Sequence, residues 1–140
     1  MKIFLDANIL VSVLNKEYPH FTYTSRILSL ADKKRFALFT SPVCIAIAFY
    51  FAEKKYRSIS AKKRIEVLCE HINITTTNKS IVLQSLQNIA VNDFEDGLEY
   101  YSALESKCDC IITEDVEDFY FSKIEVLNSQ DFFQKHLFPH

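Results

Sequence analysis

Glycine is almost absent from this chain of 140 residues, in which Gly97 is the only one. A P-loop and a G-x-G-x-x-G fingerprint each need several glycines, because the backbone must approach a phosphate closely. The sequence therefore argues against both types of nucleotide-binding fold. Gly97 lies in a predicted helix, where glycine costs roughly 1 kcal/mol relative to alanine. We therefore expect a close backbone approach at Gly97, by the strand that ends at Asp6.

Cysteine and histidine metal motifs and long apolar runs are also absent. The four cysteines form no C-x-x-C pair, and the four histidines lack zinc-ligand spacing. We interpret the cysteines as reduced, small apolar residues, with a redox pair of Cys108 and Cys110 as the less favoured alternative. No apolar run approaches the ~20 residues that span a bilayer, and Lys2 and Asp6 interrupt the N-terminal one. We expect a cytoplasmic protein without a membrane segment.

Charge is distributed unevenly along the chain, although the net charge is only −2. Residues 1–70 contain twelve Lys and Arg and six acids, whereas residues 71–140 contain four and twelve. The basic half includes Lys54, Lys55 and Arg57, which either form a solvated helix face or bind a polyanion beside an acidic centre. The length fits one domain, residues 1–140, with its own hydrophobic core.

Short apolar runs alternate with helical patterns along the whole chain. The predicted strands are 2–5, 36–40, 72–76, 110–113 and 126–127. The predicted helices are 8–15, 24–33, 42–56, 60–71, 78–90, 94–107 and 129–137. Asn8, Ser41 and Asp93 are candidate N-caps. The alternation predicts an α/β fold, a three-layer α/β/α sandwich with a central parallel sheet of four to five strands.

Acidic residues follow two of the predicted strands. Asp6 closes the first strand, and Asp115 and Asp118 follow Thr113 at the end of the fourth. The carboxyl ends of parallel strands form the edge where open α/β folds bind ligands. Carboxylates brought together there repel one another unless a cation lies between them. The sequence therefore predicts a divalent-metal site and phosphate chemistry, although Asp6 could instead only cap the following helix.

A third acidic group lies at the start of the predicted helix 94–107. Asp93 and Asp96 are three residues apart and share a helix face that differs from the core stripe. Asp93 and Glu95 fit helix-start residues, because each acid there contributes ~0.3–1 kcal/mol with the helix dipole. Asp96 precedes Gly97, and we expect the close approach at this glycine to bring Asp96 next to Asp6. Glu114 and Glu117 are expected to face solvent.

These residues resemble the motifs of PIN-domain ribonucleases. Lys2-Ile3-Phe4-Leu5-Asp6-Ala7-Asn8 is similar to the family's opening strand-Asp-x-Asn, and Asp93 to Gly97 resembles its third motif. Ile111-Ile112-Thr113-Glu114-Asp115 with Asp118-Phe119 resembles its fourth. Each motif is weak alone, but three in order across one small domain are fairly specific.

The resemblance implies a Mg²⁺- or Mn²⁺-dependent ribonuclease, of a kind found as the toxin of bacterial toxin–antitoxin pairs and often dimeric. By motif position, Asp6, Asp96 and Asp115 would bind the metal, with Asp118 as a further catalytic residue. Asn8 and Thr113 would support them. The expected partners are an RNA substrate, a cognate antitoxin protein and a second copy of the chain, with Lys54, Lys55 and Arg57 positioning the RNA backbone.

One position departs from the family's pattern. The second motif places an acidic or amide residue in the helix that follows the second strand, and here that position falls at or near Ile47. Glu53 lies almost two turns later and is a poor substitute. Two alternatives therefore stay open: a catalytically degenerate protein that binds RNA or protein, and, less favoured, a haloacid-dehalogenase-type phosphatase. The latter needs a second aspartate where this chain has Asn8.

Overall fold

Five parallel strands form one sheet in the computed structural model, which describes residues 1–137. The strand order is β3-β2-β1-β4-β5, and every neighbouring pair is parallel. The strands are β1 (Lys2–Leu5), β2 (Ala37–Thr40), β3 (Asn73–Ile74), β4 (Cys110–Ile112) and β5 (Glu125–Leu127). The predicted parallel sheet is confirmed, and β5 lies at an edge as expected.

The central strands are apolar on both faces, because helices cover the sheet on both sides. Ile3, Phe4 and Leu5 of β1 are buried, as is the whole of β4. The helices are α1 (Ala7–Asn15), α2 (Phe21–Leu28), α3 (Pro42–Cys69), α4 (Lys79–Gln87), α5 (Phe94–Glu105) and α6 (Ser129–Phe132), which continues as a π-helical turn at Phe133–Leu137. Short 3-10 turns cover Ser29–Asp32 and Val116–Phe119.

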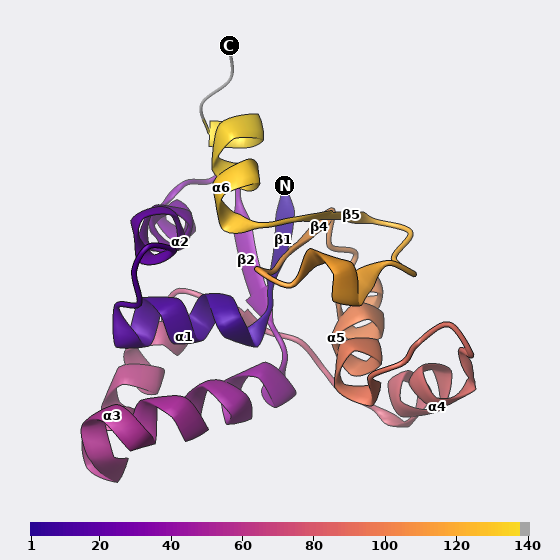
Figure 1. The fold of residues 1–140 in the computed structure, drawn as a ribbon, viewed down its shortest axis with the longest axis horizontal. Helices are drawn as coiled ribbons and strands as arrows, with labels where there is room; N and C mark the ends of the chain where they lie inside the picture. The colour runs from indigo at the N-terminus through magenta and orange to yellow at the C-terminus, as the bar shows by residue number, and fades with distance from the viewer. Residues whose placement is uncertain (138–140) are drawn as a thin grey trace.

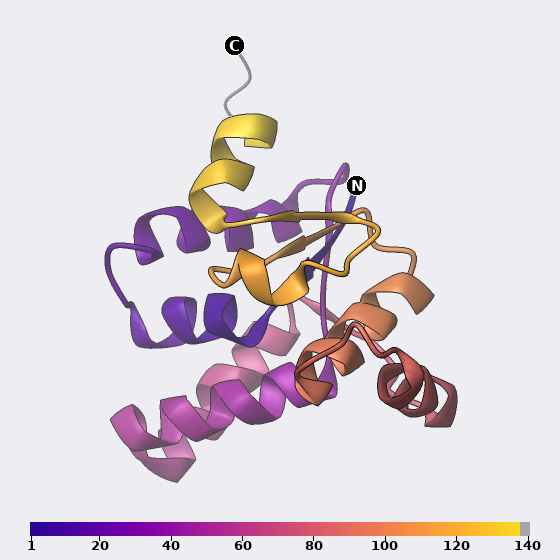
Figure 2. The ribbon, with the colours of Figure 1, turned by 45° about the vertical axis from the view of Figure 1, so that its right-hand side comes forward.

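The helices form the two outer layers of the sandwich. Figures 1 and 2 show α1, α2 and α6 on one side of the sheet and α5 with α4 on the other. In Figure 1, α3 lies below α1, and these two helices share an extensive contact. The α/β/α architecture predicted from the sequence is therefore confirmed. Within residues 1–137, no helix is both long and apolar enough to cross a membrane.

The two helices predicted at 42–56 and 60–71 are the two parts of α3. Arg57 separates them with a left-handed backbone conformation (φ 64°, ψ 169°), which breaks the helix just after the predicted end at residue 56. Ser41 caps the first part as predicted, since its hydroxyl accepts a hydrogen bond from the backbone N–H of Cys44 at 3.2 Å. Pro42 occupies the first turn, where its missing N–H costs nothing.

The prediction that Asn8 caps the first helix is wrong. Asp6 is the N-cap, and its carboxylate accepts a hydrogen bond from the backbone N–H of Ala7 at 2.6 Å. Asn8 lies inside α1, and its side chain is free to reach another segment. The N-cap lies two residues earlier than predicted, and the helix begins one residue earlier, because β1 passes into α1 without a loop.

The prediction that the strand bearing Asp6 approaches Gly97 is also wrong. A methyl group added at Gly97 would lie 2.9 Å from Cγ1 of Val91 and 3.0 Å from Cβ of Ser85. Ser85 belongs to α4 and Val91 to the loop between α4 and α5. The glycine therefore lets α4 pack closely on α5. It affects the position of Asp96 only through this packing of α5, and not through a contact with β1.

Candidate metal centre

Asp6 lies at the carboxyl edge of the sheet, between β1 and α1. Its backbone N–H donates to the carbonyl of Ile112 at 3.0 Å, which extends the pairing of β1 with β4 by one residue. One carboxylate oxygen accepts from Ala7, and the other accepts from the hydroxyl of Thr113 at 2.7 Å. Asp6 is only 8% exposed. Asp6 caps α1, and its carboxylate is held in a fixed orientation at the edge of the sheet. Capping the helix and binding a metal therefore do not exclude each other.

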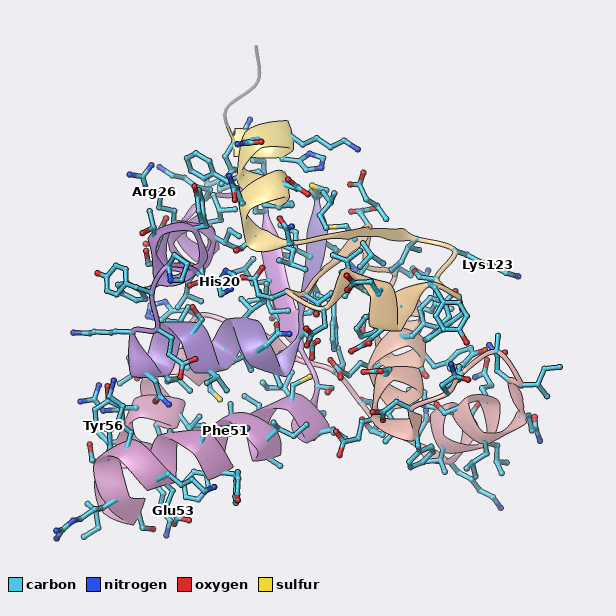
Figure 3. The ribbon with its side chains drawn as sticks, viewed as in Figure 1. His20, Arg26, Phe51, Glu53, Tyr56 and Lys123 are labelled. Carbon is cyan, nitrogen blue, oxygen red and sulfur yellow. The ribbon has the colours of Figure 1, made fainter. Side chains whose placement is uncertain are left out.

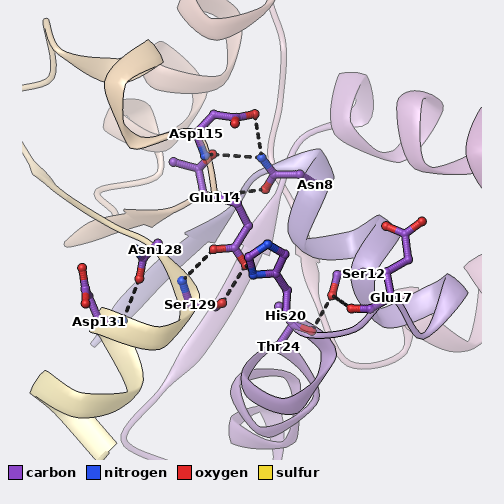
Figure 4. A network of polar contacts seen from close by, with 11 residues as sticks. Asn8, Ser12, Glu17, His20, Thr24, Glu114, Asp115, Asn128, Ser129 and Asp131 are labelled. Carbon is purple, nitrogen blue, oxygen red and sulfur yellow. Dashed lines mark hydrogen bonds and ion pairs between the residues drawn. The ribbon is translucent and has the colours of Figure 1, made fainter.

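Asn8 connects α1 to the end of β4. Its side-chain amide donates to the Thr113 hydroxyl and to the Asp115 carboxylate, each at 3.2 Å, as Figure 4 shows for the Asp115 contact. Its carbonyl oxygen accepts from the backbone N–H of Glu114 at 3.2 Å. The Thr113 hydroxyl also accepts from the backbone N–H of Asp115 at 3.0 Å. These contacts fix the chain from 113 to 115 beside Asp6.

Glu114 does not face solvent as predicted. Its carboxylate accepts from the backbone N–H of Ser129 at 3.2 Å and from the Ser129 hydroxyl at 2.6 Å, and it lies 3.3 Å from Nδ1 of His20 (Figure 4). Ser129 begins α6, and His20 precedes α2. Glu114 therefore joins the ends of three segments next to the acidic site, a role that sequence spacing alone does not show.

Helix α5 brings two more carboxyl groups to the same edge. Asp93 caps the helix as predicted, accepting from the backbone N–H of Glu95 at 2.9 Å. Asp96 and Glu99 lie one turn apart on one face. Both line a pocket of about 350 Å³ with Asp6, Asn8, Asp115 and Asp118. The structure thus places every predicted carboxylate at one pocket, with Thr113 buried behind Asp6.

Glu99 is the site residue that the sequence interpretation missed. It is 2% exposed, and Sγ of Cys44 donates to its Oε1 at 3.0 Å. Oxygen atoms of Asp6 and Glu99 and Sγ of Cys44 all lie within 4.8 Å of one another. The available signal was the three-residue spacing of Asp96 and Glu99, which places both on one helix face.

Burial and mutual repulsion raise the pKa of several of these groups. Burial, with the charges of Asp93 and Asp6, raises the pKa of Asp96 to about 7. Burial, followed by the proximity of Cys44 and Asp6, raises the pKa of Glu99 well above its usual range. Burial likewise raises the pKa of the Cys44 thiol to about 11. The site therefore holds protons that a bound cation would displace.

The donor set fits a divalent cation. Among residues 1–137, no Lys, Arg or His side chain forms an ion pair with Asp6, Asp96, Glu99, Asp115 or Asp118. A buried carboxyl pair without a basic partner is costly when ionised, and a metal ion removes that cost. Asp6, Asp96 and Asp115 line the pocket, and carboxylate oxygens are ligands that hard divalent cations prefer. Glu99 supplies a further carboxylate beside them.

Ile47 lines this pocket, together with Phe51 one turn later on α3. The position where an acid was expected therefore faces the site and is apolar. Figure 3 shows Glu53 on the side of α3 away from α1, and this residue is exposed, so it is no substitute. Glu99 lines the same pocket from α5.

The three predicted RNA-binding residues lie further along α3 and do not line the pocket. Lys55 is engaged within the protein, because its ammonium donates to the backbone carbonyl of Asn15. Lys54 lies over the ring of Tyr50, 4.2 Å from its centre, and is exposed. Arg57 lies at the break in α3. Of the three, Lys54 is therefore an exposed side chain whose ammonium lies beside the aromatic residues of α3.

The comparison of the whole sequence with family models decides the family. A model described as PIN domain matches residues 2–117, which includes Asp6, Asp96 and Asp115. The chain belongs to the PIN-domain family. On that ground we set aside the haloacid-dehalogenase alternative. No curated protein matches the PIN-domain chain at a significant level.

Solved structures with the same fold cover almost all of this PIN-domain chain. VapBC-1 from nontypeable Haemophilus influenzae matches with a TM-score of 0.70 and 20% identity, over 93% of this chain and 99% of that one. VapBC2 from Rickettsia felis was solved bound to a DNA fragment from its promoter. It matches with a TM-score of 0.69 and 15% identity, over 91% of this chain and 98% of that one. VapC20 from Mycobacterium tuberculosis is described as a Sarcin-Ricin loop cleaving toxin. It matches with a TM-score of 0.67 and 13% identity, over 88% of this chain and 98% of that one. At these identities the likeness establishes the fold.

Proposed function

We propose that this PIN-domain protein is a divalent-metal-dependent endoribonuclease and the toxin of a toxin–antitoxin pair. The observation that carries the proposal is the convergence of Asp6, Asp96, Asp115 and Asp118 at one pocket on the carboxyl edge of the sheet. The similarity in fold to VapC20, a toxin that cleaves the Sarcin-Ricin loop, supports a ribonuclease over other phosphodiesterases. A cognate antitoxin and a second copy of the chain are the expected protein partners.

The protein's own residues divide the work at this site. Asp6, Asp96 and Asp115 are the proposed metal ligands, and Glu99 adds a carboxylate where Ile47 cannot. Mg²⁺ or Mn²⁺, when bound, supplies an activated water and neutralises charge on the phosphoryl group. Thr113 orients the Asp6 carboxylate, and Asn8 orients that of Asp115. Asp118 lies at the exposed rim of the pocket, where it can accept a proton from an attacking water.

The surface beside the pocket provides groups that suit RNA. Tyr50 and Phe51 are exposed large aromatic side chains on α3, and Phe51 lines the pocket wall. Lys54 lies one turn beyond them. Exposed aromatic rings stack on unpaired bases, and lysine contacts phosphates without reading sequence. We propose that a single-stranded RNA segment follows α3 from Lys54 to the acidic pocket.

The test combines metal binding with RNA cleavage. The purified protein should bind Mn²⁺ in a calorimetric titration and cleave RNA with Mn²⁺ or Mg²⁺ but not in EDTA. Asp96→Asn should abolish cleavage, whereas Asp32→Asn, a surface carboxylate near the amino end of β2, should leave it intact. Equal cleavage by wild type and Asp96→Asn would point to a contaminating nuclease and refute the assignment.

A second function, a catalytically degenerate RNA- or protein-binding PIN domain, is favoured by one observation, the apolar Ile47 at the pocket wall. The same experiment separates the two functions. The degenerate protein would show no Mn²⁺ isotherm and no metal-dependent cleavage, yet would still bind RNA or its protein partner.

A further inference from the structure

A buried thiol lies next to two of the carboxylates that line the acidic pocket. Cys44 is in the first turn of α3 and is fully buried, with Sγ 3.0 Å from Oε1 of Glu99. Sulfur and the nearest carboxylate oxygens of Asp6 and Glu99 lie within 4.8 Å of one another. Three segments that are distant in sequence therefore direct one soft and two hard ligand atoms at a common point.

The burial of Glu99 adds to the case for a cation at this cluster. It is 2% exposed and lines the pocket. Its hydrogen-bond partner is the Cys44 thiol, within the cluster itself, and among residues 1–137 no basic side chain forms an ion pair with it. A buried carboxylate without an external donor needs either a proton or a positive ion.

The geometry fits a small ion with three protein ligands. When three atoms lie within 4.8 Å of one another, a point exists within about 2.8 Å of each, close to Zn–S and Zn–O bonds of ~2.0–2.3 Å. A contraction of about 0.5–0.8 Å, which a rotamer adjustment at Glu99 can supply in part, reaches bonding distance. The pocket side of Asp6 and Glu99 leaves room for a water as fourth ligand.

We propose that Asp6, Glu99 and Cys44 form a binding site for a thiophilic divalent cation of the zinc class. Thiolate ligands select zinc-like ions, whereas Mg²⁺ and Mn²⁺ prefer all-oxygen sites. Asp6 belongs to both donor sets, so a zinc-class ion at Cys44 and a Mg²⁺ or Mn²⁺ ion at Asp6, Asp96 and Asp115 compete. The inference goes beyond the proposed ribonuclease activity and does not require it, because the Cys44 thiolate has no part in the ligand set proposed for Mg²⁺ or Mn²⁺.

Cobalt is the probe that reports this site directly. A Co²⁺–thiolate bond gives a charge-transfer absorption band in the near ultraviolet that carboxylate ligands do not give. The reduced wild-type protein should show this band with one equivalent of Co²⁺. Zn²⁺ should remove the band at equal concentration, whereas the same concentration of Mg²⁺ should leave it.

The cysteine variants assign the band. Cys44→Ser should abolish it, and Cys110→Ser should retain it, since Cys110 is equally buried but belongs to β4. Two measurements do not depend on the folding of Cys44→Ser. Glu99→Gln keeps the thiol and should weaken Zn²⁺ binding at least tenfold. X-ray absorption of the zinc-loaded wild type should show one sulfur ligand. The absence of the band in the wild type, its persistence in Cys44→Ser, or zinc with only oxygen or nitrogen ligands would overturn the proposal.

The outcome is distinguishable from that of the ribonuclease proposal. Metal-dependent RNA cleavage with no cobalt–sulfur band would leave the nuclease in place and remove the zinc-class site. A cobalt–sulfur band in a protein that neither binds Mn²⁺ nor cleaves RNA would support the zinc-class site and refute the ribonuclease proposal.

Discussion

The hydroxyl of Thr113 donates a 2.7 Å hydrogen bond to the carboxylate of Asp6, although 107 positions separate the two residues in the sequence. The same hydroxyl accepts from the side chain of Asn8 and from the backbone of Asp115. Thr113 is fully buried at the end of β4. One side chain therefore fixes the relative positions of two proposed metal ligands on neighbouring strands.

Replacing Thr113 by Val removes the hydroxyl while keeping the side-chain shape. The polar groups left without a partner should lower the free energy of unfolding by about 1–3 kcal/mol. Loss of this orienting group should also weaken Mn²⁺ binding by about 10- to 100-fold. Calorimetry and thermal unfolding measure the two effects, and Thr113→Ser is the control that should retain both. A Val variant that binds Mn²⁺ like the wild type would show that Thr113 does not orient a ligand.

Glu99 of α5 and Ile47 of α3 both line the acidic pocket. Glu99→Gln keeps the size of the side chain but removes its charge, so it should lower both Mn²⁺ affinity and RNA cleavage. Adding Ile47→Glu to Glu99→Gln should restore much of the loss, because it returns a carboxylate to the pocket from α3. Calorimetry and a cleavage assay on the four proteins complete a double-mutant cycle. No loss in Glu99→Gln would remove Glu99 from the site.

Stability without metal should fall as pH rises. The raised pKa of Asp96, about 7 in the folded protein against 3.8 for the unfolded group, means that the folded state binds more protons between about pH 4 and pH 7. The free energy of unfolding contributed by this group therefore decreases across that window and is constant above it, and Glu99 extends the decrease to higher pH. Thermal midpoints in EDTA should fall across the window.

Saturating Mn²⁺ should abolish or reverse this trend, because the ion stabilises the ionised carboxylates. Asp96→Asn in EDTA should also show a shallower dependence than the wild type. A midpoint in EDTA that rises from pH 5 to pH 7 would contradict the shift assigned to Asp96.

Gly97→Ala tests the close contact of α5 with Val91 and Ser85. The added methyl group would lie 2.9 Å from Val91 Cγ1, and overpacking of this kind costs about 1–3 kcal/mol, against roughly 1 kcal/mol gained in helix propensity. We expect a net loss of about 1 kcal/mol in denaturant unfolding. Val91→Ala combined with Gly97→Ala should recover part of it. A single Gly97→Ala variant more stable than the wild type would show that the contact relaxes freely.

Lys54→Ala should weaken RNA binding mainly through charge. In an Asp96→Asn background that prevents cleavage, the slope of log affinity against log salt should become shallower by about 0.7, the value for one phosphate contact on a single strand. Lys34→Ala is the matched control, because Lys34 is exposed in the turn before β2 and lies at the opposite edge of the sheet from the site. Equal slopes for the two variants would place the RNA elsewhere.

The pattern of residues along the chain is enough to predict the sheet, the helices and most of the acidic edge. Apolar runs separated by helical patterns leave few alternatives to a parallel sheet covered on both faces, and the carboxyl ends of parallel strands share one edge. Asp6 and the segment from Thr113 to Asp115 follow strands that are neighbours in the sheet, so their proximity follows from topology. Local chemistry likewise fixed the caps at Ser41 and Asp93, because these bonds join residues two or three apart.

Which side chains meet across distant segments follows from the packing of the folded chain and not from any local pattern. Glu99 is recognised as a site residue through its contact with Cys44, 55 positions earlier, and no local pattern encodes that contact. Gly97 is packed by α4 rather than by β1, and Glu114 is bound by Ser129 and His20 rather than by water. The rotation of α5 about its axis sets the direction of Glu99, and that rotation depends on how the whole helix packs.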